Sequence, residues 1–95
     1  MAFQFRDSAF KHGVTSDEIL FALTYPVHVE PEFDEARTGT GELADLFIGP
    51  SRLGGPLLEV MVQRRLPRDL VVFHAMEARQ KFLDLIPDED EEDNR

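Results

Sequence analysis

The chain of 95 residues contains no cysteine and no tryptophan, and it has no long uninterrupted apolar run. Without cysteine, disulfide bonds, thiolate zinc sites, iron–sulfur clusters and cysteine nucleophiles are all excluded. No segment approaches the roughly 18 apolar residues of a membrane-spanning helix. Residues 1–6 also lack the order of a secretion signal, in which basic residues precede apolar ones. We therefore expect a cytoplasmic protein that makes no membrane contact.

Hydrophobic residues make up 42% of the chain, and the eight phenylalanines among them suffice for one modest core but not for two. We expect a single domain over residues 1–87. Residues 88–95 hold six acidic residues and one arginine. Because like charges repel and offer nothing to bury, this segment is expected to be a disordered acidic tail.

The formal net charge of −9 argues against a generally basic surface that binds nucleic acid without sequence preference. The tail accounts for five of these negative charges. The rest of the chain is only mildly acidic, so a local basic patch stays compatible with the composition.

Motifs for cofactors and metals are missing. Gly54 and Gly55 are followed by Pro56 instead of a helix with a lysine, so a phosphate-binding loop is not expected. The three histidines are far apart in sequence, and the carboxylates of residues 30–35 lack calcium-loop spacing. We expect no cofactor and no metal site.

A capping box is the clearest local signal. Thr15 and Glu18 are spaced so that each side chain can accept a hydrogen bond from the other's backbone N–H. The motif predicts a helix of about ten residues that begins at Ser16, and Pro26 cannot continue it. Before it, residues 7–13 predict a short helix that Asp7 or Ser8 caps and Gly13 ends.

Elsewhere the pattern predicts strands, a polar loop over residues 30–41 and a closing helix over residues 77–86. Alternation in residues 57–63 indicates a sheet with one solvent-exposed face, and residues 70–75, apolar on both faces, indicate a central strand. The last three strands should form an antiparallel meander, because their links are too short for parallel crossovers. The expected strands are residues 3–5, 27–29, 43–48, 57–63 and 70–75.

This order of elements predicts an α+β domain. We expect a small antiparallel sheet of about four or five strands, with N-terminal helices and a C-terminal helix covering one face.

His74 is the most suggestive single residue, because it ends an apolar strand where an imidazole can emerge at the rim of the sheet. Such an imidazole can act as an acid or a base near neutral pH. Alternatively, His74 is a histidine hydrogen-bonded within the core. Lys11 and His12 have their own simple explanation, since cations at a helix C-terminus interact favourably with the helix dipole.

Apart from the arginine of the tail, six of the ten basic residues lie in the C-terminal half, near strand ends and the last helix. Brought together by the fold, they could form a patch of phosphate size. Scattered, solvated charges are the alternative. The six residues are Arg52, Arg64, Arg65, Arg68, Arg79 and Lys81.

Two segments resemble a known family, the BrnT-like toxins. Residues 11–14, Lys-His-Gly-Val, lead into the capped helix, and residues 73–79, Phe-His-Ala-Met-Glu-Ala-Arg, follow the hairpins. In the second segment the alanine and arginine at Ala78 and Arg79 match directly. BrnT-like toxins belong to the RelE-like group of small bacterial ribonucleases, and the resemblance covers roughly residues 3–86.

The resemblance implies a RelE-like fold and the toxin of a type II toxin–antitoxin pair, which cuts RNA without a metal. It also implies an antitoxin partner with a ribbon-helix-helix DNA-binding domain. Association of two copies of the chain into a homodimer is compatible with it. The 2′-hydroxyl of a ribose would attack the neighbouring phosphate, which requires a base, an acid and cations. The site would comprise His74 as base or acid, Arg79 with Arg64 or Arg65 as phosphate clamps, and His12 or Lys11 as auxiliary cations.

Two other functions remain open on the sequence. One is a non-catalytic protein-interaction module on the same fold, with the acidic tail as a docking element. The other is an acidic mimic of nucleic acid.

Overall fold

The structure is a computed structural model, and it describes residues 2–37, 43–65 and 69–87. No helix within these ranges has the length and apolar character needed to cross a membrane. The elements, in chain order, are β1 (Ala2–Phe5), the 3₁₀ helix η1 (Asp7–Phe10), α1 (Ser16–Thr24), β2 (His28–Arg37), β3 (Leu43–Pro50), β4 (Leu57–Arg65), β5 (Asp69–Glu77) and α2 (Gln80–Leu83).

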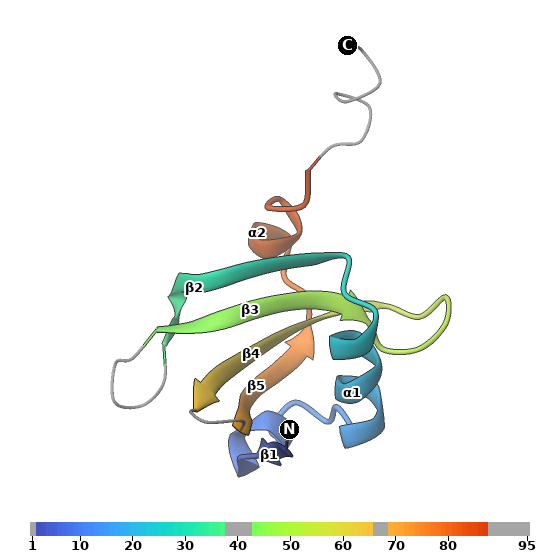
Figure 1. Cartoon of the computed structure of the whole chain (residues 1–95). Coiled ribbons are helices and arrows are strands. Elements are labelled where there is room, and N and C mark those ends of the chain that lie inside the picture. Colours follow the sequence, from blue (N-terminus) through green and yellow to red (C-terminus); the bar gives the residue numbers. More distant parts are fainter. Residues whose placement is uncertain (1, 38–42, 66–68, 88–95) are drawn as a thin grey trace.

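The strands form one five-stranded sheet in the order β1-β5-β4-β3-β2, drawn as a curved layer in Figure 1. Strands β3 to β5 make the predicted antiparallel meander, and β2 adds a fourth antiparallel strand to it. The expectation of a wholly antiparallel sheet is wrong, because β1 pairs with β5 in parallel. Residues 6–68 separate these two strands, so no short turn dictates their relative direction. The domain is therefore α+β with a mixed sheet.

Helix α1 begins where the capping box predicts. The backbone N–H of Glu18 donates to Thr15 Oγ1 (3.2 Å), and the backbone N–H of Thr15 donates to Glu18 Oε1 (2.9 Å). Ile19 and Ala22 are fully buried against the sheet. A Cβ atom at Gly49 in β3 would overlap the carbonyl oxygen of Ala22. Glycine at this position therefore lets the helix pack directly onto the strand.

Both faces of the sheet are covered, so the predicted solvent-exposed face of β4 is wrong. One face packs under α1, with Leu58, Val60 and Val62 of β4 in its core. The other face carries Met61 and packs against Phe82 of α2. Alternate side chains of β4 therefore enter two different apolar layers, one on each face of the sheet. The period-two pattern of β4 distinguishes these two layers, not core from solvent.

Strand β2 corrects the predicted loop over residues 30–41. Residues 30–37 continue the strand, although Pro31 lies among them. Proline is tolerated there because β2 is an edge strand, and its pairing with β3 is irregular on either side of Phe33. Glu32 has a positive φ of 49°, and its backbone N–H donates to Asp45 Oδ1 (2.9 Å). Residues 38–41, like the predicted tail, lie outside the described residues.

The closing helix is much shorter than the predicted span of residues 77–86, since α2 covers only Gln80–Leu83. Glu77 instead ends β5, opposite Leu58 of β4. The backbone N–H of Ala78 then donates to the carbonyl of Leu57 (2.9 Å) and extends the sheet. Cross-strand hydrogen bonding therefore holds the first residues of the predicted helix in the sheet.

The short helix predicted over residues 7–13 is present as η1, but neither predicted cap is used. Arg6 occupies the N-cap position without a side-chain hydrogen bond. Ser8 Oγ donates instead to the carbonyl of Phe73 in β5 (2.6 Å). The pairing of β1 with β5 ends at Val72. Beyond that point η1 lies along the same edge of β5. Gly13 has a φ of 82°, the left-handed conformation expected of it.

We predict that Thr15→Ala lowers the free energy of unfolding by about 1 kcal/mol, because it leaves the backbone N–H of Glu18 without its acceptor. Denaturant melts measure the change. Thr24→Ala is the matched control: its hydroxyl donates to the carbonyl of Leu20 at the other end of α1 (2.7 Å). That variant should differ from wild type by less than about 0.5 kcal/mol. Equal losses in the two variants would contradict a specific role for the cap.

Candidate functional site

A buried carboxylate lies at the centre of the candidate site. Glu59 of β4 is 0% exposed. Its neighbours across the sheet are Ile48 of β3 and Met76 of β5. A carboxylate in apolar surroundings is costly unless charged or hydrogen-bonding groups surround it.

Two residues supply those groups. Arg79 donates from Nη2 to Glu59 Oε2 (2.7 Å), from Nε to Oε1 (3.1 Å) and from its backbone N–H to Oε1 (2.9 Å). His74 Nε2 lies 2.8 Å from Glu59 Oε2. The guanidinium grips the carboxylate with two parallel hydrogen bonds, a strong and directional arrangement. Arg79 immediately precedes α2, so this pair also ties the helix to the sheet.

A β-bulge in β5 brings His74 to this face. Val72 lies opposite Val62, but His74 lies opposite Met61, so Phe73 is an extra residue in the pairing. Strict alternation would have placed His74 on the same face as Val72, under α1. The extra residue reverses that orientation and turns the imidazole toward Glu59.

The partners keep Glu59 ionised. Burial alone raises the pKa of this carboxyl, but hydrogen bonds from His74 and Arg79 and the charge of Arg79 lower the pKa from 4.5 to about 2. An ionised carboxylate only accepts hydrogen bonds. His74 Nε2 must therefore carry the hydrogen of this contact, which leaves Nδ1 as the ring nitrogen available to a ligand.

The partners reach the surface while the carboxylate does not. The side chain of His74 is 21% exposed and that of Arg79 is 45% exposed, against 0% for Glu59. A ligand at this surface would therefore meet an imidazole and a guanidinium, with the negative charge that orients them hidden beneath.

A second histidine faces the first. The ring of His12, which follows η1, lies edge-on to the ring of His74 with 5.7 Å between centroids. His12 is exposed. We call Glu59, His74, Arg79 and His12 the Glu59 cluster. Sequence analysis selected three of its members, and the structure brings those three together.

Cations also gather over the neighbouring aromatic ring. The guanidinium carbon of Arg79 and Nζ of Lys81 each lie 4.9 Å from the ring centroid of Phe82. The negative face of an aromatic ring attracts cations at this range. Phe82, almost fully buried, thus contributes to the placement of Arg79 in the cluster and of Lys81 near it.

The other sequence-selected bases lie elsewhere. Arg64 is on the face of β4 that α1 covers, and its Nε pairs with Asp45 Oδ2 (2.9 Å). Arg65 shares the face of Glu59 but is six positions further along β4, about 20 Å away in an extended strand. Lys11 is exposed and directly precedes His12. The structure therefore separates Arg64 and Arg65 from the cluster, whereas Lys11 is adjacent to one of its members in the chain.

The third histidine has a separate environment. His28 Nε2 lies 2.8 Å from Glu30 Oε1 in β2. Within the described parts of the chain, no three histidine, aspartate or glutamate side chains are arranged to hold a metal ion.

Sequence reasoning missed Glu59, the residue that organises the cluster. A glutamate alternating with apolar residues is usually solvent-exposed, and the prediction followed that rule. The available signal was on the same face of the sheet, where Met61 of β4 and Leu46 and Ile48 of the neighbouring β3 are apolar. A charged residue among them requires partners.

Comparisons of the chain with models of protein families, with curated proteins and with solved structures found no match. Function must therefore be argued from the cluster itself.

We predict that the protein loses stability as the pH falls from 4.5 towards 2. The folded state holds the pKa of Glu59 at about 2, below its ordinary 4.5, so the stabilisation is complete above pH 4.5 and disappears near pH 2. The shift corresponds to roughly 3 kcal/mol. Urea melts across this range should show Glu59→Gln to be less stable than wild type at pH 7 and less sensitive to acid.

The matched control is Glu77→Gln, because Glu77 is exposed at the end of β5. It should keep the stability and the acid response of wild type. If Glu59→Gln behaved in the same way, the carboxylate could not be the buried anchor described above.

Proposed function

We propose that this chain is a metal-independent ribonuclease of the BrnT-like kind, a toxin with a RelE-like fold that acts in the cytoplasm. On this proposal a ribbon-helix-helix antitoxin holds it inactive. The observation that carries the proposal is the Glu59 cluster, in which one buried carboxylate holds an imidazole and a guanidinium at the surface. The two segments that resemble the family, residues 11–14 and 73–79, supply the other three members of that cluster.

The cluster suits RNA cleavage by the substrate's own 2′-hydroxyl. An imidazole can accept the proton of the 2′-hydroxyl or donate one to the leaving oxygen. A guanidinium can bind the phosphate and stabilise the negative charge that develops on it. Neither step needs a nucleophile from the protein. Two further bases agree with an RNA site at the cluster. Lys11 directly precedes His12 in the sequence, and Lys81 follows Arg79 by two residues.

We predict that the purified protein cleaves RNA in the presence of EDTA and that Arg79→Ala lowers the rate at least about 100-fold. Arg79→Lys tests the same residue while keeping its charge, and it should also be slow because lysine lacks the planar fork. Gel analysis of a labelled RNA gives both rates.

Arg52→Ala is the matched control. Arg52 is 67% exposed in the loop after β3, and its guanidinium contacts Glu18 (3.8 Å) and Ser51 Oγ (3.4 Å), both outside the Glu59 cluster, so its loss should leave cleavage unchanged. In cells, wild type should arrest growth and Arg79→Ala should not. Intact RNA and unimpaired growth with folded wild-type protein would overturn the ribonuclease proposal.

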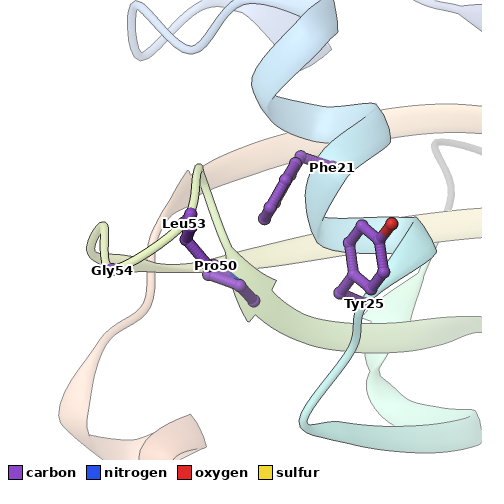
Figure 2. Close-up of a pocket in the computed structure, with 5 residues that line it drawn as sticks. All are labelled: Phe21, Tyr25, Pro50, Leu53 and Gly54. Atoms are coloured by element: carbon purple, nitrogen blue, oxygen red, sulfur yellow. The ribbon is translucent and has the colours of Figure 1, made fainter.

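A second candidate function is a non-catalytic interaction module, and a specific surface favours it. A pocket of about 510 Å³ lies between α1 and the loop after β3, lined by Phe21, Tyr25, Pro50, Leu53 and Gly54 (Figure 2). Leu53 is 92% exposed and Tyr25 is 60% exposed. Exposed apolar surface of this kind is typical of sites that bind another protein. In this alternative the Glu59 cluster only anchors α2, and RNA stays intact.

A further inference from the structure

We propose that the Glu59 cluster is a two-histidine acid–base pair, in which His74 Nδ1 is the general base and His12 is the general acid. The inference rests on the proposed ribonuclease function and assigns the two proton transfers within it. The observation behind it is the approach of the two rings, which come from opposite ends of the chain and lie edge-on at 5.7 Å.

The orientation of His74 selects its reactive atom. Nε2 is committed to Glu59 at 2.8 Å, and the ionised carboxylate fixes the hydrogen on that nitrogen. Nδ1 therefore presents a lone pair and can accept a proton. A buried carboxylate behind a histidine also stabilises the imidazolium that forms, as in other carboxylate–histidine pairs. Glu59 is thus a positioning residue, and His74 is the base.

The position of His12 suits the complementary role. It is exposed, so water can solvate its charged form and return a proton to it after each turnover. It is not among the donors to Glu59. At 5.7 Å between centroids the two rings are in edge-to-face contact, so a single phosphodiester that lies against the pair can reach both imidazoles. Arg79 Nη2 and His74 Nε2 contact the same oxygen, Glu59 Oε2, so the guanidinium lies beside the imidazole and can bind the oxygens of that phosphate.

The reaction balances with these two groups. His74 Nδ1 takes the proton of the ribose 2′-hydroxyl while the 2′-oxygen forms a bond to phosphorus. The bond from phosphorus to the 5′-oxygen breaks, and protonated His12 gives its proton to that oxygen. The products are a 2′,3′-cyclic phosphate and a 5′-hydroxyl. Solvent then restores the starting protonation of both imidazoles.

A substrate with sulfur in place of the bridging 5′-oxygen separates the two roles. A thiol is far more acidic than an alcohol, so a thiolate leaves without being protonated. We expect His12→Gln to slow cleavage of ordinary RNA about 10²–10⁴-fold and to cleave the sulfur-bridged RNA nearly as fast as wild type. His74→Gln should slow both substrates, because both need the 2′-hydroxyl to lose its proton.

His28→Gln is the matched control, since His28 contacts Glu30 in β2 and no member of the cluster. It should cleave both substrates at the wild-type rate. Both substrates are tested on the same preparation of each variant, so a partly unfolded sample lowers both rates equally and leaves their ratio intact.

Two results would overturn the acid–base pair while leaving the ribonuclease proposal intact: His12→Gln slows both substrates equally, or it slows neither. If folded wild-type protein cleaves neither substrate, the ribonuclease proposal fails and the acid–base pair fails with it.

Discussion

The burial of one carboxylate constrains much of the C-terminal half of this fold. Glu59 is fully enclosed, and a buried ion without partners costs several kcal/mol. Three features satisfy it: the bulge in β5 that turns His74 inward, the extension of sheet pairing through Ala78, and the chain direction at Arg79 that aims its backbone N–H at the carboxylate. The same features end β5 and start α2, so the candidate site and the second core depend on one another.

Local signals predicted what depends on local contacts. The capping box at Thr15 and Glu18 places the start of α1, because both partners lie within one helical turn. Three meander strands were predicted for a similar reason, since short turns impose antiparallel pairing. The parallel pairing of β1 with β5 joins opposite ends of the chain. Nothing within either segment specifies the direction of its distant partner, so that feature needed the structure.

The site was only partly predictable for the same physical reason. His74 and Arg79 stood out because their side chains suit acid–base and phosphate chemistry and lie at a strand end. Glu59 did not, because the period-two pattern of β4 is the same whether its second face meets water or a second apolar layer. The bulge was equally hidden, since Phe73 differs from an ordinary strand residue only through its pairing. Both depend on contacts between strands.

The acidic composition of the chain is compatible with the candidate RNA site when the position of each charge in the fold is considered. Glu59 neutralises Arg79, so on the proposed function further positive charge has to come from His12 as the acid and from lysines such as Lys11 and Lys81. Such a site attracts an RNA ground state only weakly. It would stabilise the extra charge of a transition state more effectively, because its donors are already oriented and partly withdrawn from water. Interactions that strengthen only in the transition state accelerate a reaction, whereas uniformly tight binding does not. An acidic protein can therefore act on RNA through one preorganised cluster without a broad basic surface.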